Sequence, residues 1–219
     1  MGSGNTTFTL LELFKLGGAI MWPLTAYSIV VLTIGVERII YYARHDRRLD
    51  DMGAKVSEFI AARDYSGAQA YLSPLTQRRL GARILLALVN RAQPAEGRAF
   101  SEHQVERAAE TEAMTCIGLL ENSLNFLVAM GSLSPLTGFL ATVTGMISAF
   151  KSIAEASEVN AQIVALGIYE ALITTVVGLA IAIVAMIFHS IFSHISDRFA
   201  ADVERTCSDL IADIADQHK

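Results

Sequence analysis

The chain has 219 residues, of which 53% are hydrophobic and only 18% are charged, and its mean hydropathy is +0.42. Soluble domains usually carry about 25% charged residues, so this composition excludes an ordinary soluble domain. The net charge of −5, with no segment rich in Lys and Arg, excludes a nucleic-acid-binding protein.

The first long uncharged stretch covers residues 16–36, which is enough for a membrane-spanning helix. We predict a span over residues 19–42, with Trp22 in the aromatic belt at its first interface. Residues 1–18 are predicted to lie in the outer interface, with a frayed terminus as the alternative. Basic residues gather at the far end of this span, which places the N-terminus in the periplasm and the following chain in the cytoplasm. These residues are Arg38, Arg44, Arg47 and Arg48.

The segment between the first and second spans, residues 43–122, is predicted to be a cytoplasmic helical domain. Pro74 and Pro94 divide it. Ser101 followed by Gln104 is typical of a capping box, so a new helix is expected to begin there and to continue into the second span.

Two further spans follow in the second half of the chain. Residues 122–150 are all uncharged and predict a span over 123–150. A short periplasmic connection is expected at 151–162, before a third span at 163–192. Apolar residues then recur at intervals of three and four, so the third helix is predicted to continue as a cytoplasmic C-terminal helix over 193–219. The predicted fold class is all-α: an integral membrane protein with three transmembrane helices and long cytoplasmic helical extensions.

Small residues gather on one face of the second and third spans, as they do where membrane helices pack closely. Gly138 and Gly145 lie on that face of the second span, and Gly178 lies on that face of the third. Pro135 sits inside the second span and is expected to kink it or to free a carbonyl. A tightly packed bundle without a conduit would explain most of this pattern.

Glu170 is the only Asp, Glu, Lys or Arg between residues 160 and 196. It lies some seven residues inside the predicted third span, roughly 10 Å below the outer interface at 1.5 Å per residue. A carboxylate inside a membrane costs about 2.5–3.5 kcal/mol on insertion scales, and such residues usually mark ion pathways. The alternative is that Glu170 snorkels outward or caps a neighbouring helix.

Three threonines accompany Glu170 in the predicted pathway. Thr174 and Thr175 follow it on the third span, and Thr142 lies on the small-residue face of the second. Their hydroxyls can hydrogen-bond a carboxyl group in either protonation state or relay a proton through water. The alternative is that each hydroxyl bonds back to the carbonyl one turn earlier.

Three motifs carry a resemblance to a known family of membrane proteins. The first is LGGAIMWPL at residues 16–24, with VER at 36–38 near the end of the span. The second is SPLTGFLATVTGMISAF at 134–150, and the third is GIYEALITTVVGLAIAI at 167–183. Together they resemble the MotA/TolQ/ExbB proton-channel family, and its ExbB branch most closely.

The resemblance implies a function and an assembly. Glu170 matches the family's intramembrane glutamate, and Thr175 and Thr142 match its threonines on the third and second spans. The family forms a homopentameric ring, and its partners are an ExbD-like single-span membrane protein and a TonB-like protein. The implied role is a proton-channel or motor subunit of the bacterial inner membrane that uses the proton motive force to energise TonB-dependent transport across the outer membrane. Three positions depart from the family pattern, namely Ala141, Val184 and His189.

Alternatives remain open within and outside the family. The chain could be a TolQ-like subunit of the Tol–Pal system or a sodium-driven relative. A passive membrane scaffold is a further alternative. We expect no enzyme activity, no cofactor and no metal site, since no nucleophile–base pair is visible and His189 and His194 fall on different helix faces. The expected surroundings are membrane lipids.

Overall fold

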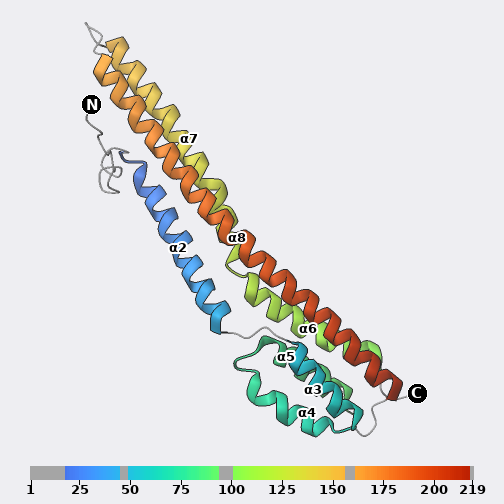
Figure 1. Ribbon diagram of the computed structural model, residues 1–219. Coiled ribbons are helices and arrows are strands. Elements are labelled where there is room, and N and C mark those ends of the chain that lie inside the picture. Colours follow the sequence, from blue (N-terminus) through green and yellow to red (C-terminus); the bar gives the residue numbers. More distant parts are fainter. Residues whose placement is uncertain (1–17, 45–48, 94–100, 156–160, 218–219) are drawn as a thin grey trace, which may run out of the picture. The chain divides into compact units, whose positions relative to one another are not determined.

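The computed structural model describes residues 18–44, 49–93, 101–155 and 161–217, and all the regular elements in these ranges are helices (Figure 1). The described residues divide into two compact units. One contains the chain up to Val36 together with Leu124–Ser190, and the other contains Glu37–Ser123 and the chain from Ile191 onwards. The helices are α2 (Met21–Arg44), α3 (Asp50–Ala61), α4 (Tyr65–Leu72), the short η1 (Ser73–Leu75), α5 (Leu80–Ala92), α6 (Glu102–Glu121), α7 (Leu124–Glu155) and α8 (Ala161–Gln217).

Three stretches of helix in the described residues are long and apolar enough to cross a membrane. They are α2, the consecutive helices α6 and α7 over Glu102–Glu155, and Ala165–Asp216 within α8. A helix satisfies all its backbone hydrogen bonds within the segment, which lipid requires. The prediction of an all-helical chain with three candidate spans is therefore confirmed.

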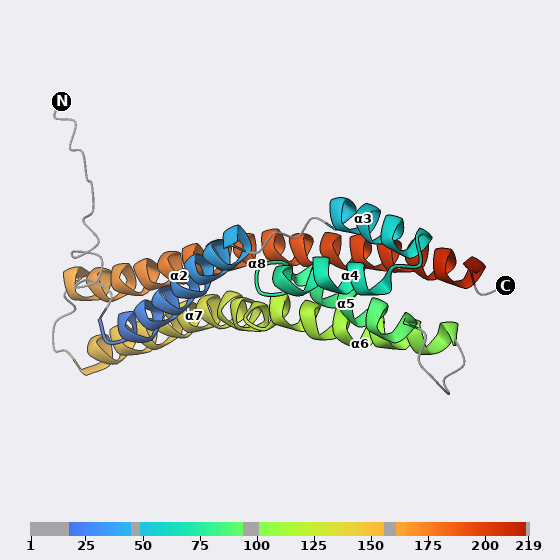
Figure 2. The same ribbon diagram turned by 90° about the horizontal axis from the view of Figure 1, so that it is seen from below.

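The first unit is built from α7, the first part of α8 and most of α2. α7 and α8 run side by side in both views (Figure 1, Figure 2). α2 also comes close to α8, because a Cβ added at Gly35 would lie 2.5 Å from the Phe188 ring. Elsewhere α2 exposes large apolar side chains, as expected of a helix that meets lipid: Trp22, Ile29 and Leu32.

The second unit contains α3 to α6 and the last part of α8 around an apolar core. Its core side chains on α8 recur at three- and four-residue intervals, which is the predicted amphipathic pattern. These buried residues are Phe199, Val203, Cys207, Leu210 and Ile214. On the surface of this unit the Ser57 hydroxyl donates to the Asp213 carboxylate at 2.8 Å, which ties α3 to α8.

Arg38 occupies a buried position in the second unit, at the end of α6. Arg38 is 3% exposed, and its side chain donates to the carbonyls of Leu119 at 2.8 Å and Leu120 at 3.0 Å. It also donates to the Ser123 hydroxyl at 2.7 Å, while the Tyr42 hydroxyl donates to Leu120 O at 3.0 Å. A guanidinium at a helix C-terminus satisfies carbonyls that have no partner in the helix and opposes the partial negative charge there.

The observed helices differ from the expected elements in three places. The helix expected to run from Ser101 into the second span is divided into α6 and α7 at residues 122–123. α7 continues to Glu155 and α8 begins at Ala161, so both extend into the connection expected at 151–162. Ser101 is the N-cap of α6, but its side chain makes no capping hydrogen bond, so the capping box is wrong in that detail. The segment expected in the outer interface, residues 1–18, lies outside the described residues except for Gly18.

Candidate functional site

The site begins with the close contact between α7 and α8. A Cβ added at Gly178 would lie 2.5 Å from Ser134 O, and one added at Gly138 would lie 2.9 Å from Thr175 Cα. A Cβ at Gly145 would lie 2.9 Å from Ala171 Cβ. Real Cβ atoms do not approach other atoms so closely, so these glycines allow the two backbones to meet. Pro135 lies inside α7 next to this contact.

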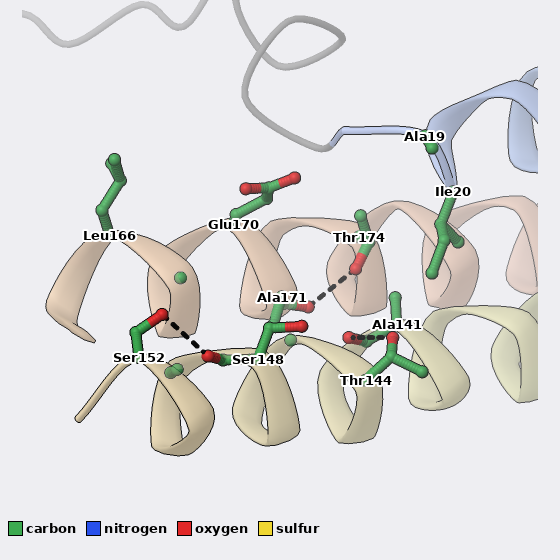
Figure 3. A pocket seen from close by; sticks show the side chains of 13 residues that line it. Ala19, Ile20, Ala141, Thr144, Ser148, Ser152, Leu166, Glu170, Ala171 and Thr174 are labelled. Carbon is green, nitrogen blue, oxygen red and sulfur yellow. Dashed lines mark hydrogen bonds between the residues drawn. The ribbon is translucent and has the colours of Figure 1, made fainter. Parts of the chain in front are cut away.

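A cavity of about 400 Å³ lies in the same unit, between α7, α8 and the turn before α2 (Figure 3). Its volume is enough for several water molecules. Glu170 lines it and is half-buried. Glu170 and Thr174 project from the same side of α8, the side on which Ala19 lies (Figure 3). No hydrogen bond or ion pair joins the Glu170 carboxylate to any residue that the structure describes.

The wall that α7 contributes to this cavity carries three hydroxyl groups. They belong to Thr144, Ser148 and Ser152, which are spaced four residues apart on one face of the helix. Thr144 donates to Leu140 O at 2.9 Å, and Ser152 donates to Ser148 O at 3.0 Å. Each hydroxyl oxygen therefore keeps lone pairs that can accept a hydrogen bond from the cavity. The sequence pattern did not mark these three residues as site residues.

Thr174 joins Glu170 in the cavity. Its side chain is 1% exposed, and its hydroxyl donates to Ala171 O at 2.8 Å. Back-bonding to the preceding turn therefore uses its proton, and only its oxygen lone pairs are left to meet a carboxylic acid or a water molecule.

Thr142 and Thr175 form a separate pair that does not line the cavity. The Thr175 hydroxyl donates across the helix contact to Gly138 O at 2.8 Å, and the two hydroxyl oxygens are 3.4 Å apart. The predicted set of one carboxylate and three threonines is therefore split into two groups. The reason is helical geometry, since adjacent residues such as Thr174 and Thr175 point about 100° apart.

This arrangement suits the exchange of a proton better than bond-breaking chemistry. A carboxylate beside a water-sized cavity can bind and release a proton, and the lone pairs of the nearby hydroxyls can accept a hydrogen bond from its protonated form. Among the described residues there is no group of three or more His, Cys, Asp or Glu side chains placed to hold a metal ion.

Comparison with known proteins decides the family. Residues 77–205, more than half of the chain, match the sequence profile described as the MotA/TolQ/ExbB proton channel family. The chain belongs to this family. The matched region includes α7 and the part of α8 that carries Glu170 and the threonines.

Individual relatives support the same assignment. The chain is 32% identical over 204 residues to the biopolymer transport protein ExbB-like 1 of Synechocystis sp., which covers 88% of this chain and 75% of that protein. It is 26% identical to the biopolymer transport protein ExbB of Salmonella typhimurium, over 80% of this chain and 71% of that protein. A shorter match, 45% identical over 34% of this chain and 32% of the relative, is to the Tol–Pal system protein TolQ of Pseudomonas aeruginosa. Membership of this family supports a membrane protein with a transport role coupled to the proton motive force.

Proposed function

We propose that this chain is an ExbB-like subunit of a proton-driven motor in the bacterial inner membrane. With an ExbD-like partner it uses the proton motive force to energise a TonB-like protein and transport across the outer membrane. Family membership supports the class of activity. The observation that carries the proposal for this chain is Glu170, a carboxylate on an apolar helix that lines a cavity and has no partner among the described residues.

In this proposal Glu170, Thr174, Thr175 and Thr142 lie on the proton pathway. The proton reaches Glu170 from the cavity, because water there can carry it by hydrogen bonds while the α7 hydroxyls accept hydrogen bonds from that water. Thr142 and Thr175 then form the next polar group, at the contact between α7 and α8. A proton that crosses the membrane releases about 2.3 kcal/mol per 100 mV, which supplies the work.

The proposed assembly and orientation follow from the resemblance and from the charge pattern. The chain forms a homopentamer, with its N-terminus in the periplasm and its C-terminus in the cytoplasm. The exposed apolar side chains of α7 and α8 support an assembly in which neighbouring copies or lipid cover them. Native mass spectrometry of the purified complex tests the pentamer, and any other copy number would reject it.

The decisive experiment replaces Glu170 by Gln, which keeps the size of the side chain but cannot release a proton. We expect Glu170→Gln to assemble normally and to lose gradient-dependent uptake in a strain that lacks its own ExbB. The matched control is Glu155→Gln, since Glu155 is an exposed carboxylate that pairs with Lys151 at 3.7 Å. Uptake at the parent level in Glu170→Gln would reject the proposal.

A TolQ-like role is the second candidate, because the match to TolQ of Pseudomonas aeruginosa reaches 45% identity over its 74 residues. The two roles differ in the cell. An ExbB-like subunit restores TonB-dependent uptake to a strain lacking ExbB, whereas a TolQ-like subunit restores outer-membrane integrity to a strain lacking TolQ. A sodium-driven relative would keep its activity when a protonophore is added and lose it when sodium is withdrawn.

A further inference from the structure

The turn that precedes α2 lies directly against the Glu170 carboxylate, although the two are far apart in the sequence. The residue in contact is Gly18, and a Cβ added there would overlap Oε1 of Glu170 and lie 3.2 Å from its Cδ. The neighbouring residues Ala19 and Ile20 line the same cavity as Glu170 (Figure 3). The main chain at Gly18 therefore limits where the carboxylate can lie.

Two separate requirements select glycine at position 18. Its φ of +62° lies in the left-handed region, which is unfavourable for residues with a Cβ. The second requirement is the space that the carboxylate takes up. Gly167 also lines the cavity but has no such shortage of space. A Cβ added there would come no closer than 3.6 Å to another atom, Ala149 Cβ, which is an ordinary contact.

Position matters for Glu170 because a flexible side chain transfers a proton only when its carboxyl group is within hydrogen-bond reach of the donor or acceptor. No hydrogen bond or ion pair to the described residues fixes this carboxylate. Contact with the backbone of the turn is the constraint that the structure does provide.

We propose that Gly18 is a positioning residue for Glu170, and that the turn before α2 holds the carboxylate at the place in the cavity where it exchanges protons. This inference rests on the proposed function of Glu170. A methyl group at position 18 displaces the carboxylate. Shortening the side chain by one methylene, as in Glu170→Asp, withdraws the carboxylate from that methyl group.

The test is a double-mutant cycle of Gly18→Ala and Glu170→Asp. The readout is the rate at which a hydrophobic carbodiimide labels the carboxyl group at position 170 in membranes, measured by mass spectrometry. Carbodiimides react with protonated carboxyl groups, so the rate reports the accessibility and protonation of this group and requires no transport. Gly118→Ala is the matched control, since a Cβ there meets nothing within 4 Å.

We expect Gly18→Ala to change the labelling rate strongly in the parent chain and only weakly in the Glu170→Asp background. The expected coupling is about threefold or more, within the range found for residues in contact. Gly18→Ala should also lower gradient-dependent uptake, whereas Gly118→Ala should not. An equal effect of Gly18→Ala in both backgrounds would mean that backbone strain alone explains the glycine, and this would overturn the inference.

Failure to assemble is also informative in this cycle. If Gly18→Ala alone does not assemble but the double variant does, overlap with the carboxylate is the cause and the inference is supported. If neither assembles, backbone strain is the cause and the inference is rejected. Normal labelling and uptake in Gly18→Ala, together with loss of uptake in Glu170→Gln, would reject the positioning role alone. Uptake retained in Glu170→Gln would reject the proposed function itself.

Discussion

Arg38 shows how a single buried charge can organise the end of a helix. Its guanidinium makes three hydrogen bonds, two to carbonyls of α6 and one to Ser123, where that helix ends. The carbonyl of Leu120 also accepts the Tyr42 hydroxyl. Arginine spreads its N–H donors over a planar fork, and Arg38 uses two of its nitrogens here, so the single ammonium of lysine is not equivalent.

We predict that Arg38→Ala destabilises the protein by about 2–4 kcal/mol, because it leaves buried carbonyls without their charged donor. Arg38→Lys should fall between this variant and the parent. The measurement is thermal unfolding in detergent, with Arg107→Ala on the exposed face of α6 as the control. Equal unfolding temperatures for Arg38→Ala and Arg107→Ala would show that the buried contacts contribute nothing.

The two cysteines are buried thiols in the second unit, and the structure gives both as free. Burial raises the pKa of Cys116 to about 11, against the opposing effect of Arg83, and burial also raises the pKa of Cys207 to about 11. Both thiols therefore stay protonated and unreactive near neutral pH.

The raised pKa values predict a loss of stability at high pH. Below the ordinary thiol pKa of 9.0 both states hold the proton and the stabilisation is fully present. As pH rises from 9.0 towards 11, the unfolded chain releases protons that the folded chain keeps, so the free energy of unfolding falls. Between pH 9 and 11 the free energy of unfolding should fall more steeply with pH in the parent than in the double variant Cys116→Ala/Cys207→Ala. Identical pH dependence in the two would contradict this assignment, as would rapid alkylation of the folded protein.

At the scale of helices, the contact between α7 and α8 depends on where side chains are missing. We predict that Gly178→Ala destabilises the protein by about 1–3 kcal/mol, the usual effect of overpacking. Its added Cβ would meet the backbone oxygen of Ser134, which cannot move aside as a flexible side chain could. Gly118→Ala is the control and should be neutral or stabilising by up to about 1 kcal/mol, since alanine favours a helix. The measurement is thermal unfolding of both variants. Equal unfolding temperatures for Gly178→Ala and Gly118→Ala would contradict the close contact.

The sequence could predict this helix contact because small residues recur at helical intervals on both partners. The sequence could not predict which hydroxyl groups line the cavity and which lie at the helix contact. That assignment depends on how each helix is rotated about its axis in the packed unit. Thr174 thus shares a cavity with Glu170, while Thr175 bonds across to Gly138. Thr144 and Ser148 carry no sequence signal that separates a cavity wall from a packing face, and only the packed unit places them in the wall.

Contacts between distant parts of the chain were beyond sequence reasoning. Gly18 belonged to a recognised motif, but nothing in its spacing indicated that it meets Glu170. For Arg38 the sequence indicates a charge at one end of a span and a place in the VER motif, whereas its main contacts are carbonyls of a helix some eighty residues later. In both cases the decisive physics is the steric and hydrogen-bond environment that tertiary packing creates.

At the scale of the whole molecule, the described residues combine three apolar stretches of helix with a second unit that is rich in charged residues. α8 has 57 residues, far more than the roughly 20 needed to cross a bilayer. Its first part carries Glu170, and its last part contributes to the core of the second unit. One helix therefore carries both the proposed proton site and residues of the second unit.

The most direct test of this account is proton flux through the reconstituted complex. The chain and the proposed ExbD-like partner are placed in liposomes, a potassium diffusion potential is imposed, and internal pH is followed with a dye. We predict that the parent and Glu155→Gln conduct protons and that Glu170→Gln does not. Equal flux in Glu170→Gln and the parent would contradict the central claim that this carboxylate carries the proton.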